Sequence, residues 1–142
     1  MILESERRAI VETIVRYCTA IDTGAWELIG DVFLPNARVD YRGAGGPLLS
    51  GAETADWLRE HMAEFAILQH FISNVRVTQD GDEVRSAAYV HAVHGYKGDD
   101  GSMRFFDLGG EYKDRLLETS AGWRISERVL STKWLRGDLP GD

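Results

Sequence analysis

The strand-like pattern that fills the second half of the sequence is its most restrictive feature. Four long stretches are rich in Val, Ile, Tyr, Phe and Trp, and they lie at about residues 67–78, 84–97, 103–118 and 122–134. Glycine-containing breaks separate them, at 79–82, 98–101 and 119–122. Breaks of this composition are typical of hairpin turns. The pattern therefore predicts a meander of long antiparallel strands.

The beginning of the sequence has the spacing of an amphipathic helix instead. Apolar residues recur at i, i+4, i+7 and i+11 from Ile10 onwards, and most charged residues fall outside this stripe. This spacing predicts a helix from about Ser5 to Asp22, which Thr23-Gly24 ends.

Two shorter helices are expected before the meander begins. Residues 26–33 have apolar residues at helical intervals, 37–42 alternate like a strand, and 43–47 form a glycine-rich loop. Ser50 followed by Glu53 matches a capping box, which predicts the start of a third helix. This helix is expected to carry Trp57, Leu58, His61, Met62 and Phe65.

Helices first and strands afterwards predict an α+β fold, with the helices packed on one face of a curved antiparallel sheet. The length of 142 residues is that of one ordinary domain, 1–142, which can bury enough surface to enclose a pocket. We expect its core at about 5–134, followed by a frayed C-terminal tail.

Charge and cysteine content favour some functional classes over others. The net charge of −7, with acidic residues spread along the chain, argues against nucleic acid or an anionic membrane surface as the partner. Cys18 is the only cysteine, so no internal disulfide or thiolate metal cluster is expected. No apolar run approaches the roughly 20 residues of a membrane span, and the first residues lack the order of a secretory signal. We therefore expect a cytoplasmic protein with a small-molecule ligand.

Asp22 and His70 form the candidate catalytic pair. Asp22 lies in the last turn of the first helix, where the helix dipole disfavours a carboxylate by a few tenths to about 1 kcal/mol, so it needs a partner. His70 lies in an apolar run, Leu68 to Asn74. A carboxylate beside an imidazole fixes its tautomer and raises its basicity, which suits proton removal next to a carbonyl. Taken alone, each residue is more often structural: the aspartate as part of a helix stop, the histidine as a satisfied strand residue.

The period of the stretch 84–97 separates its two histidines. Its even positions are small or apolar and include His94, which therefore points into the core or a pocket. His91 points to the other face, towards the surface or a subunit interface. Because the two side chains point apart, they do not form a metal pair, and no metal or cofactor is expected.

Several motifs together resemble a known family. They are Tyr17…Ala20-Ile21-Asp22, Val39-Asp40-Tyr41-Arg42, Gln69-His70-Phe71-Ile72-Ser73-Asn74, His91-Ala92-Val93-His94-Gly95-Tyr96, Gly110-Glu111-Tyr112 and Gly122-Trp123-Arg124-Ile125. In these the chain resembles the SnoaL-like branch of the nuclear transport factor 2 superfamily. It is similar in particular to scytalone dehydratase and more loosely to bile-acid dehydratases and hexachlorocyclohexane dehydrochlorinase. The resemblance implies a cone-shaped α+β barrel around one deep pocket, commonly in homodimers or homotrimers.

The resemblance also implies roles for individual residues. Asp22 and His70 match the family's Asp–His dyad, and Tyr41 matches a tyrosine that helps to hold a water on the substrate carbonyl of scytalone dehydratase. His94 matches that enzyme's second pocket histidine, and Tyr17 has the tyrosine spacing of the bile-acid enzymes.

The chain also departs from scytalone dehydratase at three positions. Ile21 stands where that enzyme has a tyrosine, and Gly110 and Tyr112 stand where it has a serine and an asparagine. We therefore do not expect scytalone itself as the substrate.

These observations predict a cofactor-free, dehydratase-like lyase for a small hydrophobic, cyclic hydroxy-carbonyl compound. His70 would remove the α-proton, and Tyr41, Tyr17 or His94 would hydrogen-bond the enolate oxygen or the departing hydroxide. Residues expected around the substrate are Trp26, Phe33, Trp57, Phe65, Phe71, Phe106, Tyr112 and Arg128. Arg128 has an ion pair with an acidic neighbour as its alternative, and His61 is either structural or at the pocket edge.

Three alternatives to a lyase remain open. An isomerase or polyketide cyclase would use the same base without losing a leaving group. A small-ligand-binding protein would keep the pocket with an inert His70, and an accessory protein like a dioxygenase β subunit would use a partner-binding surface.

Overall fold

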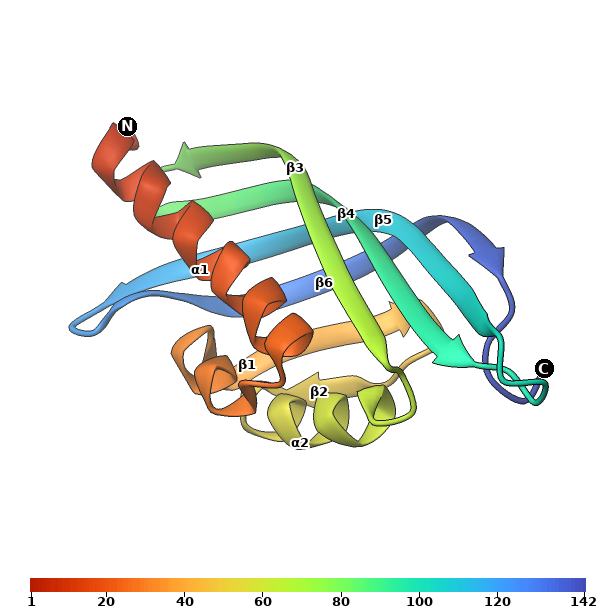
Figure 1. The fold of residues 1–142 in the computed structure, drawn as a ribbon. Helices are drawn as coiled ribbons and strands as arrows, with labels where there is room; N and C mark the ends of the chain where they lie inside the picture. Colours follow the sequence, from red (N-terminus) through yellow and green to blue (C-terminus); the bar gives the residue numbers. More distant parts are fainter.

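The four long strands expected in the second half of the sequence are present. The computed structural model describes residues 1–142, and its helices are α1 (Glu4–Thr23), the 3₁₀ helix η1 (Trp26–Asp31) and α2 (Gly51–Met62). The strands are β1 (Phe33–Gly43), β2 (Leu48–Ser50), β3 (Ile67–Asp80), β4 (Glu83–Lys97), β5 (Met103–Thr119) and β6 (Gly122–Gly137). The α+β fold class is thus confirmed (Figure 1).

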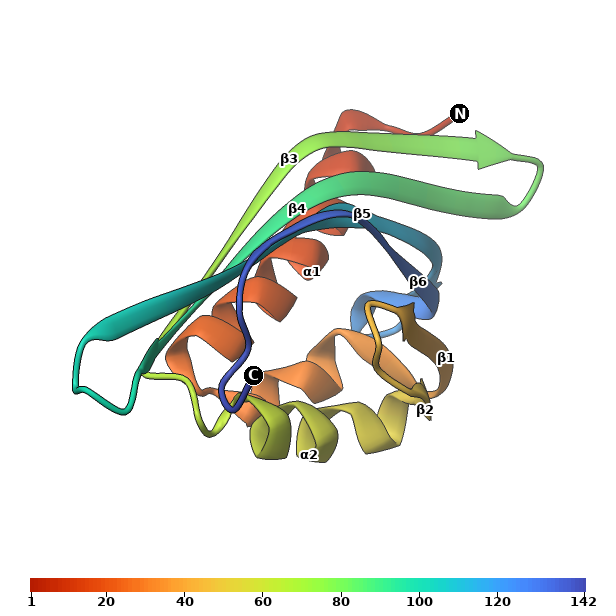
Figure 2. The same cartoon turned by 90° about the vertical axis from the view of Figure 1, so that its right-hand side faces the viewer.

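The six strands form one sheet in the order β2-β1-β6-β5-β4-β3. Consecutive long strands pair antiparallel, but β1 pairs with β6 in parallel, so the expectation of a wholly antiparallel sheet is wrong at this pair. A parallel pair needs a crossover connection, and here the crossover is the whole chain between β1 and β6. The sheet is strongly curved (Figure 2). It is open and not a closed barrel, because β2 and β3 are edge strands that do not pair with each other.

The first helix is confirmed, with one residue more at each end than expected. Its apolar stripe, from Ile10 to Ile21, is buried, and α1 lies against one face of the sheet, where it contacts β3 and β6 (Figure 1). The helix ends where Gly24 adopts the left-handed conformation with φ of 70°, which glycine reaches without steric cost. Neither α-helix has the length and apolar composition that crossing a membrane requires.

The other two helices differ from expectation at their ends. The second is a 3₁₀ helix that stops at Asp31, and Phe33 already begins β1. The Ser50–Glu53 capping box is present: the Glu53 backbone N–H donates to Ser50 Oγ at 3.2 Å, and the Ser50 N–H donates to Glu53 Oε1 at 2.9 Å. The third helix, α2, ends at Met62, so Phe65 lies beyond it. The short strand β2 was not expected, because three residues are too few to show alternation.

The expected alternation along β4 is confirmed. Every even residue from Val84 to Tyr96 is buried, whereas the odd residues other than Gly95 are partly or fully exposed. His94 therefore faces the interior, and His91 faces outwards with 39% of its side chain exposed.

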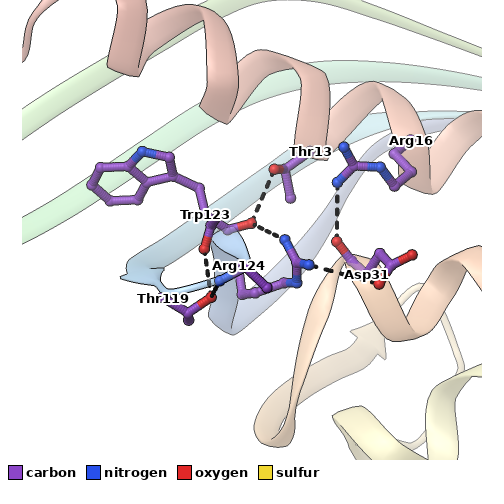
Figure 3. Close-up of polar contacts among 8 residues, drawn as sticks. Thr13, Arg16, Asp31, Thr119, Trp123 and Arg124 are labelled. Atoms are coloured by element: carbon purple, nitrogen blue, oxygen red, sulfur yellow. Dashed lines mark hydrogen bonds and ion pairs between the residues drawn. The ribbon is translucent and has the colours of Figure 1, made fainter.

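A polar junction fixes α1 relative to the β5–β6 hairpin and η1 (Figure 3). Thr13 Oγ1 donates to the Trp123 carbonyl at 3.1 Å, and Arg16 donates to the Asp31 carbonyl at 3.0 Å. Arg124 reaches both the Trp123 carbonyl and the Asp31 carboxylate. Because Tyr17 and Asp22 lie further along α1, this junction also helps to fix their positions relative to the sheet.

Candidate functional site

Asp22 and His70 are in direct contact, although they come from elements 48 residues apart in the chain. Asp22 is in the last turn of α1, and His70 is in β3, across which α1 packs. His70 Nδ1 lies 2.7 Å from Asp22 Oδ1, and the His70 backbone N–H donates to Asp22 Oδ2 at 2.8 Å. A carboxylate accepts, so Nδ1 carries the hydrogen and Nε2 of the neutral ring keeps a lone pair.

A cavity of about 280 Å³ opens beside this pair, between α1, α2 and the inner face of the sheet. His70 lines the cavity, whereas Asp22 stands behind it. Of the thirteen residues predicted for the site, eight line this cavity: Tyr17, Tyr41, Trp57, Phe65, His70, His94, Phe106 and Tyr112.

Three tyrosines line the cavity, Tyr17, Tyr41 and Tyr112, and we call them the tyrosine floor. The hydroxyls of Tyr17 and Tyr41 are hydrogen bonded to each other, and the ring of Tyr17 packs edge-on against Tyr112 with centroids 5.7 Å apart. Burial raises the pKa of all three phenols well above the ordinary value, so they stay protonated at neutral pH. Whichever hydroxyl of the Tyr17–Tyr41 pair donates to the other, one O–H remains to donate to a ligand.

His94 differs from His70 in the partner of its Nδ1. That nitrogen lies 3.1 Å from the Phe106 carbonyl, so it carries the hydrogen and Nε2 of the neutral ring is an acceptor. Burial lowers the pKa of His94, with the nearby His70 acting in the same direction. The two rings lie 6.1 Å apart. With its hydrogen on Nδ1, a neutral His94 presents Nε2 as a hydrogen-bond acceptor.

Arg128 does not line the cavity, so of its two expected positions the ion pair is the correct one. It is fully buried and makes two hydrogen bonds of 2.8 Å to the Asp114 carboxylate. Its guanidinium lies 4.4 Å from the ring centroid of Tyr17 and 3.9 Å from that of Tyr112. Arg128 therefore packs against the rings of Tyr17 and Tyr112 without lining the cavity itself.

Three aromatic residues expected in the pocket wall lie elsewhere. Phe71 follows His70 in β3, so it points to the outer face of the sheet, where it is 50% exposed and near His91. Phe33 is buried behind Tyr17, with ring centroids 5.8 Å apart. Trp26 packs against the hydrophobic core from η1 and does not reach the cavity.

The cavity has a rim that the strand pattern could not predict. His61 and Glu64 line it at the C-terminal end of α2, which settles His61 at the pocket edge, and Leu139 of the C-terminal tail lies on it as well. The glycine-rich loop contributes residues 44–46. Loop and tail residues have no periodicity, so their approach to the cavity leaves no signal in the sequence.

The donors and charges around the cavity define the ligands it can hold. No Lys or Arg is among its 20 lining residues, and Glu64 is its only carboxylate. No group of three or more His, Cys, Asp or Glu side chains is placed to hold a metal ion. The site combines an imidazole held by a carboxylate, phenol donors and apolar walls.

Comparisons with known proteins agree with this architecture. The sequence model of a family described as a SnoaL-like domain matches residues 4–129. An uncharacterized protein of Mycobacterium tuberculosis, Rv2910c, is 32% identical over 125 residues, which cover 88% of this chain and 84% of that protein.

Two solved structures share the fold over nearly the whole chain. The Kfla4162 protein of Kribbella flavida superposes with a TM-score of 0.84 at 25% identity, covering 94% of each chain. A candidate scytalone dehydratase of Novosphingobium aromaticivorans superposes with a TM-score of 0.80 at 22% identity, covering 96% of this chain and 93% of that one.

Proposed function

The chain belongs to the SnoaL-like family, and from this premise we propose that it is a cofactor-free lyase of the dehydratase type. Its substrate would be a small, hydrophobic, cyclic hydroxy-carbonyl compound. The observation that carries the proposal is the 2.7 Å contact between Asp22 Oδ1 and His70 Nδ1 at the wall of an apolar cavity. The likeness to a candidate scytalone dehydratase of the same fold is consistent with this activity.

His70 is the general base of the proposed reaction. With Nδ1 bonded to Asp22, Nε2 takes the proton from the carbon next to the carbonyl, and Asp22 stabilises the imidazolium that forms. A positioned base of this kind contributes about 10²–10⁴-fold to the rate.

The tyrosine pair stabilises the intermediate. The O–H that the Tyr17–Tyr41 bond leaves free donates to the carbonyl oxygen as it becomes an enolate. The enolate electrons then form the new C=C bond while the C–O bond to the β-hydroxyl breaks. Protonated His70 returns its proton to the departing hydroxide, which leaves as water.

His94 orients the leaving hydroxyl in this scheme. As a neutral ring it accepts a hydrogen bond from that hydroxyl at Nε2, and its position 6.1 Å from His70 places both imidazoles within one substrate's reach. Phe65 and Phe106 pack against His94, with centroids at 4.9 and 5.7 Å, and supply apolar contact to the ring of the substrate.

A screen of cyclic β-hydroxy ketones tests the proposal. Loss of water creates a conjugated enone, which is followed by ultraviolet absorbance and by the mass of the product. We expect turnover by the native protein and at least about 100-fold less by His70→Ala. His91→Ala is the matched control, since this histidine lies on the outer face of the neighbouring strand.

The same screen separates the alternatives. A new absorbance without loss of mass would indicate an isomerase that uses the same base. Full activity of His70→Ala would contradict the general-base role, and binding of ketones without any reaction would indicate a ligand-binding protein.

A further inference from the structure

His61 is the third imidazole that lines the cavity, and the proposed reaction does not use it. It lies near the C-terminal end of α2, one helical turn after Trp57, and both rings line the cavity. The residues of the proposed reaction come from α1, β1, β3 and β4 and are buried or half-buried, whereas His61 is exposed. It therefore stands at the solvent-exposed rim of the same pocket.

The orientation of His61 is fixed without a ligand. Nδ1 lies 2.9 Å from the Trp57 carbonyl, and the imidazole stacks on the Trp57 ring with centroids 4.2 Å apart and planes inclined by 23°. Because a carbonyl only accepts, Nδ1 carries the hydrogen, and Nε2 of the neutral ring is left as a hydrogen-bond acceptor.

The rim around His61 carries no cationic side chain. Glu64 is the only carboxylate among the residues that line the cavity, and no Lys or Arg lines it. A carboxylate, phosphate or nucleotide on the ligand would find no cation here, whereas a hydroxyl group would find an oriented acceptor.

Aromatic side chains lead from the buried end of the pocket to this rim. Tyr41, which is hydrogen bonded to Tyr17, lies 5.7 Å from the Trp57 ring, and Trp57 in turn stacks on His61. A flat ring system can pack along these three side chains with one end at the tyrosines and the other at His61.

We propose that His61 is a specificity-determining residue, which selects a neutral, flat, bicyclic ketone bearing a ring hydroxyl at the end remote from its carbonyl. The hydroxyl donates to Nε2 of His61 while the carbonyl occupies the tyrosine end. This inference rests on the proposed function, since that function places the carbonyl.

Binding of two matched ketones tests the inference. 1-Tetralone and 6-hydroxy-1-tetralone differ only in a ring hydroxyl remote from the carbonyl, and isothermal titration calorimetry gives Kd for each. We expect the hydroxyl to tighten binding to the native protein about tenfold, the effect of one hydrogen bond at a site from which water is partly excluded. Their ratio of Kd values is the readout.

Variants at His61 locate the effect. His61→Phe keeps a ring to stack on Trp57 but has no acceptor, so the ratio should fall to about one. His61→Gln restores an acceptor oxygen and should restore part of the preference. His91→Phe, on the outer face of the sheet, should keep the native ratio.

The possible outcomes separate this inference from the proposed reaction. A native ratio near one, a ratio unchanged in His61→Phe, or no binding of either ketone overturns the inference. His70→Ala should keep the native ratio, because the ratio measures binding. Failure of the proposed function would instead appear as turnover that His70→Ala does not reduce.

Discussion

At the scale of residues, the two buried imidazoles are distinguished by what their Nδ1 atoms contact. His70 donates to a carboxylate, which stabilises a positive charge on the ring, whereas His94 donates to a neutral carbonyl in apolar surroundings, which does not offset the loss of hydration. The same side chain can therefore act as a base at one position and as a neutral acceptor at the other.

Asp22→Asn tests how the tautomer of His70 is held. The amide can turn its NH₂ towards Nδ1, which then accepts, so the hydrogen moves to Nε2 and the base is lost. We expect a loss of turnover of about 10⁴-fold, of the size seen when a carboxylate that orients a catalytic histidine is replaced by its amide. Steady-state kinetics on a substrate from the screen measures this, with circular dichroism as the check on folding. A loss of less than threefold would show that Asp22 does not set the tautomer.

The lowered pKa of His94 predicts a dependence of stability on pH. Between the folded pKa and the unfolded value of about 6.5, the unfolded chain binds more protons than the folded one. The free energy of unfolding therefore falls as the pH drops below about 6.5. The groups that act on the His94 ring include His70, which adds to the effect of burial, and Asp107, which opposes it.

Urea unfolding between about pH 5.5 and pH 8 measures this dependence. His94→Gln removes the titrating ring, so its stability curve should be flatter than that of the native protein over this range. Parallel curves for the two proteins would contradict the assignment.

At the scale of elements, the site depends on where α1 ends and where α2 begins. α1 places Asp22 in its last turn, just before the left-handed Gly24, and α2 begins at the Ser50 capping box and carries Trp57 and His61 towards the cavity. Local sequence signals mark both ends, which is why both could be predicted.

Ser50→Ala should destabilise the protein by about 1 kcal/mol, because the backbone N–H of Glu53 loses its side-chain acceptor. Ser50→Gly should cost only a few tenths, about 0.3 kcal/mol, since glycine tolerates the cap conformation. Chemical denaturation of the two variants measures the difference. Equal stability of Ser50→Ala and the native protein would show that the capping box contributes nothing here.

At the scale of the whole molecule, a buried ion pair joins the sheet to the pocket floor. Arg128 of β6 pairs with Asp114 of β5 directly across the strands, and its guanidinium packs against the rings of Tyr17 and Tyr112. Both side chains are almost fully removed from water. The position of the tyrosines thus depends on charges in the centre of the fold.

Removing one partner should be far more costly than removing both. Arg128→Met leaves the Asp114 carboxylate buried without its cation, and we expect a loss of about 3–5 kcal/mol. The double variant Arg128→Met/Asp114→Leu should recover much of that loss, because no charge is then left unpaired. Urea denaturation of the single and double variants measures this. A double variant no more stable than Arg128→Met would contradict the account.

The sequence predicts the local features of this fold better than the distant ones. Period two along β4 places His94 inside, and the same rule applied to β3 puts Phe71 on the face opposite His70, so its expected place in the pocket conflicted with the strand pattern. The parallel pairing of β1 with β6 follows from no local pattern, because it joins distant parts of the chain. For Arg128, the sequence left two environments open, since a charge in a strand has no visible partner until the register is known. The meeting of Asp22 with His70 was inferred from the resemblance together with the helix dipole.

The central claim is that His70 removes a proton next to a ketone, and deuterium exchange tests it without knowledge of the leaving group. Incubation of 1-tetralone with the protein in D₂O, followed by NMR of the carbon next to the carbonyl, measures proton removal directly. We predict exchange well above the buffer rate with the native protein and His91→Ala, and exchange at the buffer rate with His70→Ala. Exchange by His70→Ala equal to that of the native protein, or none by the native protein, would contradict the claim.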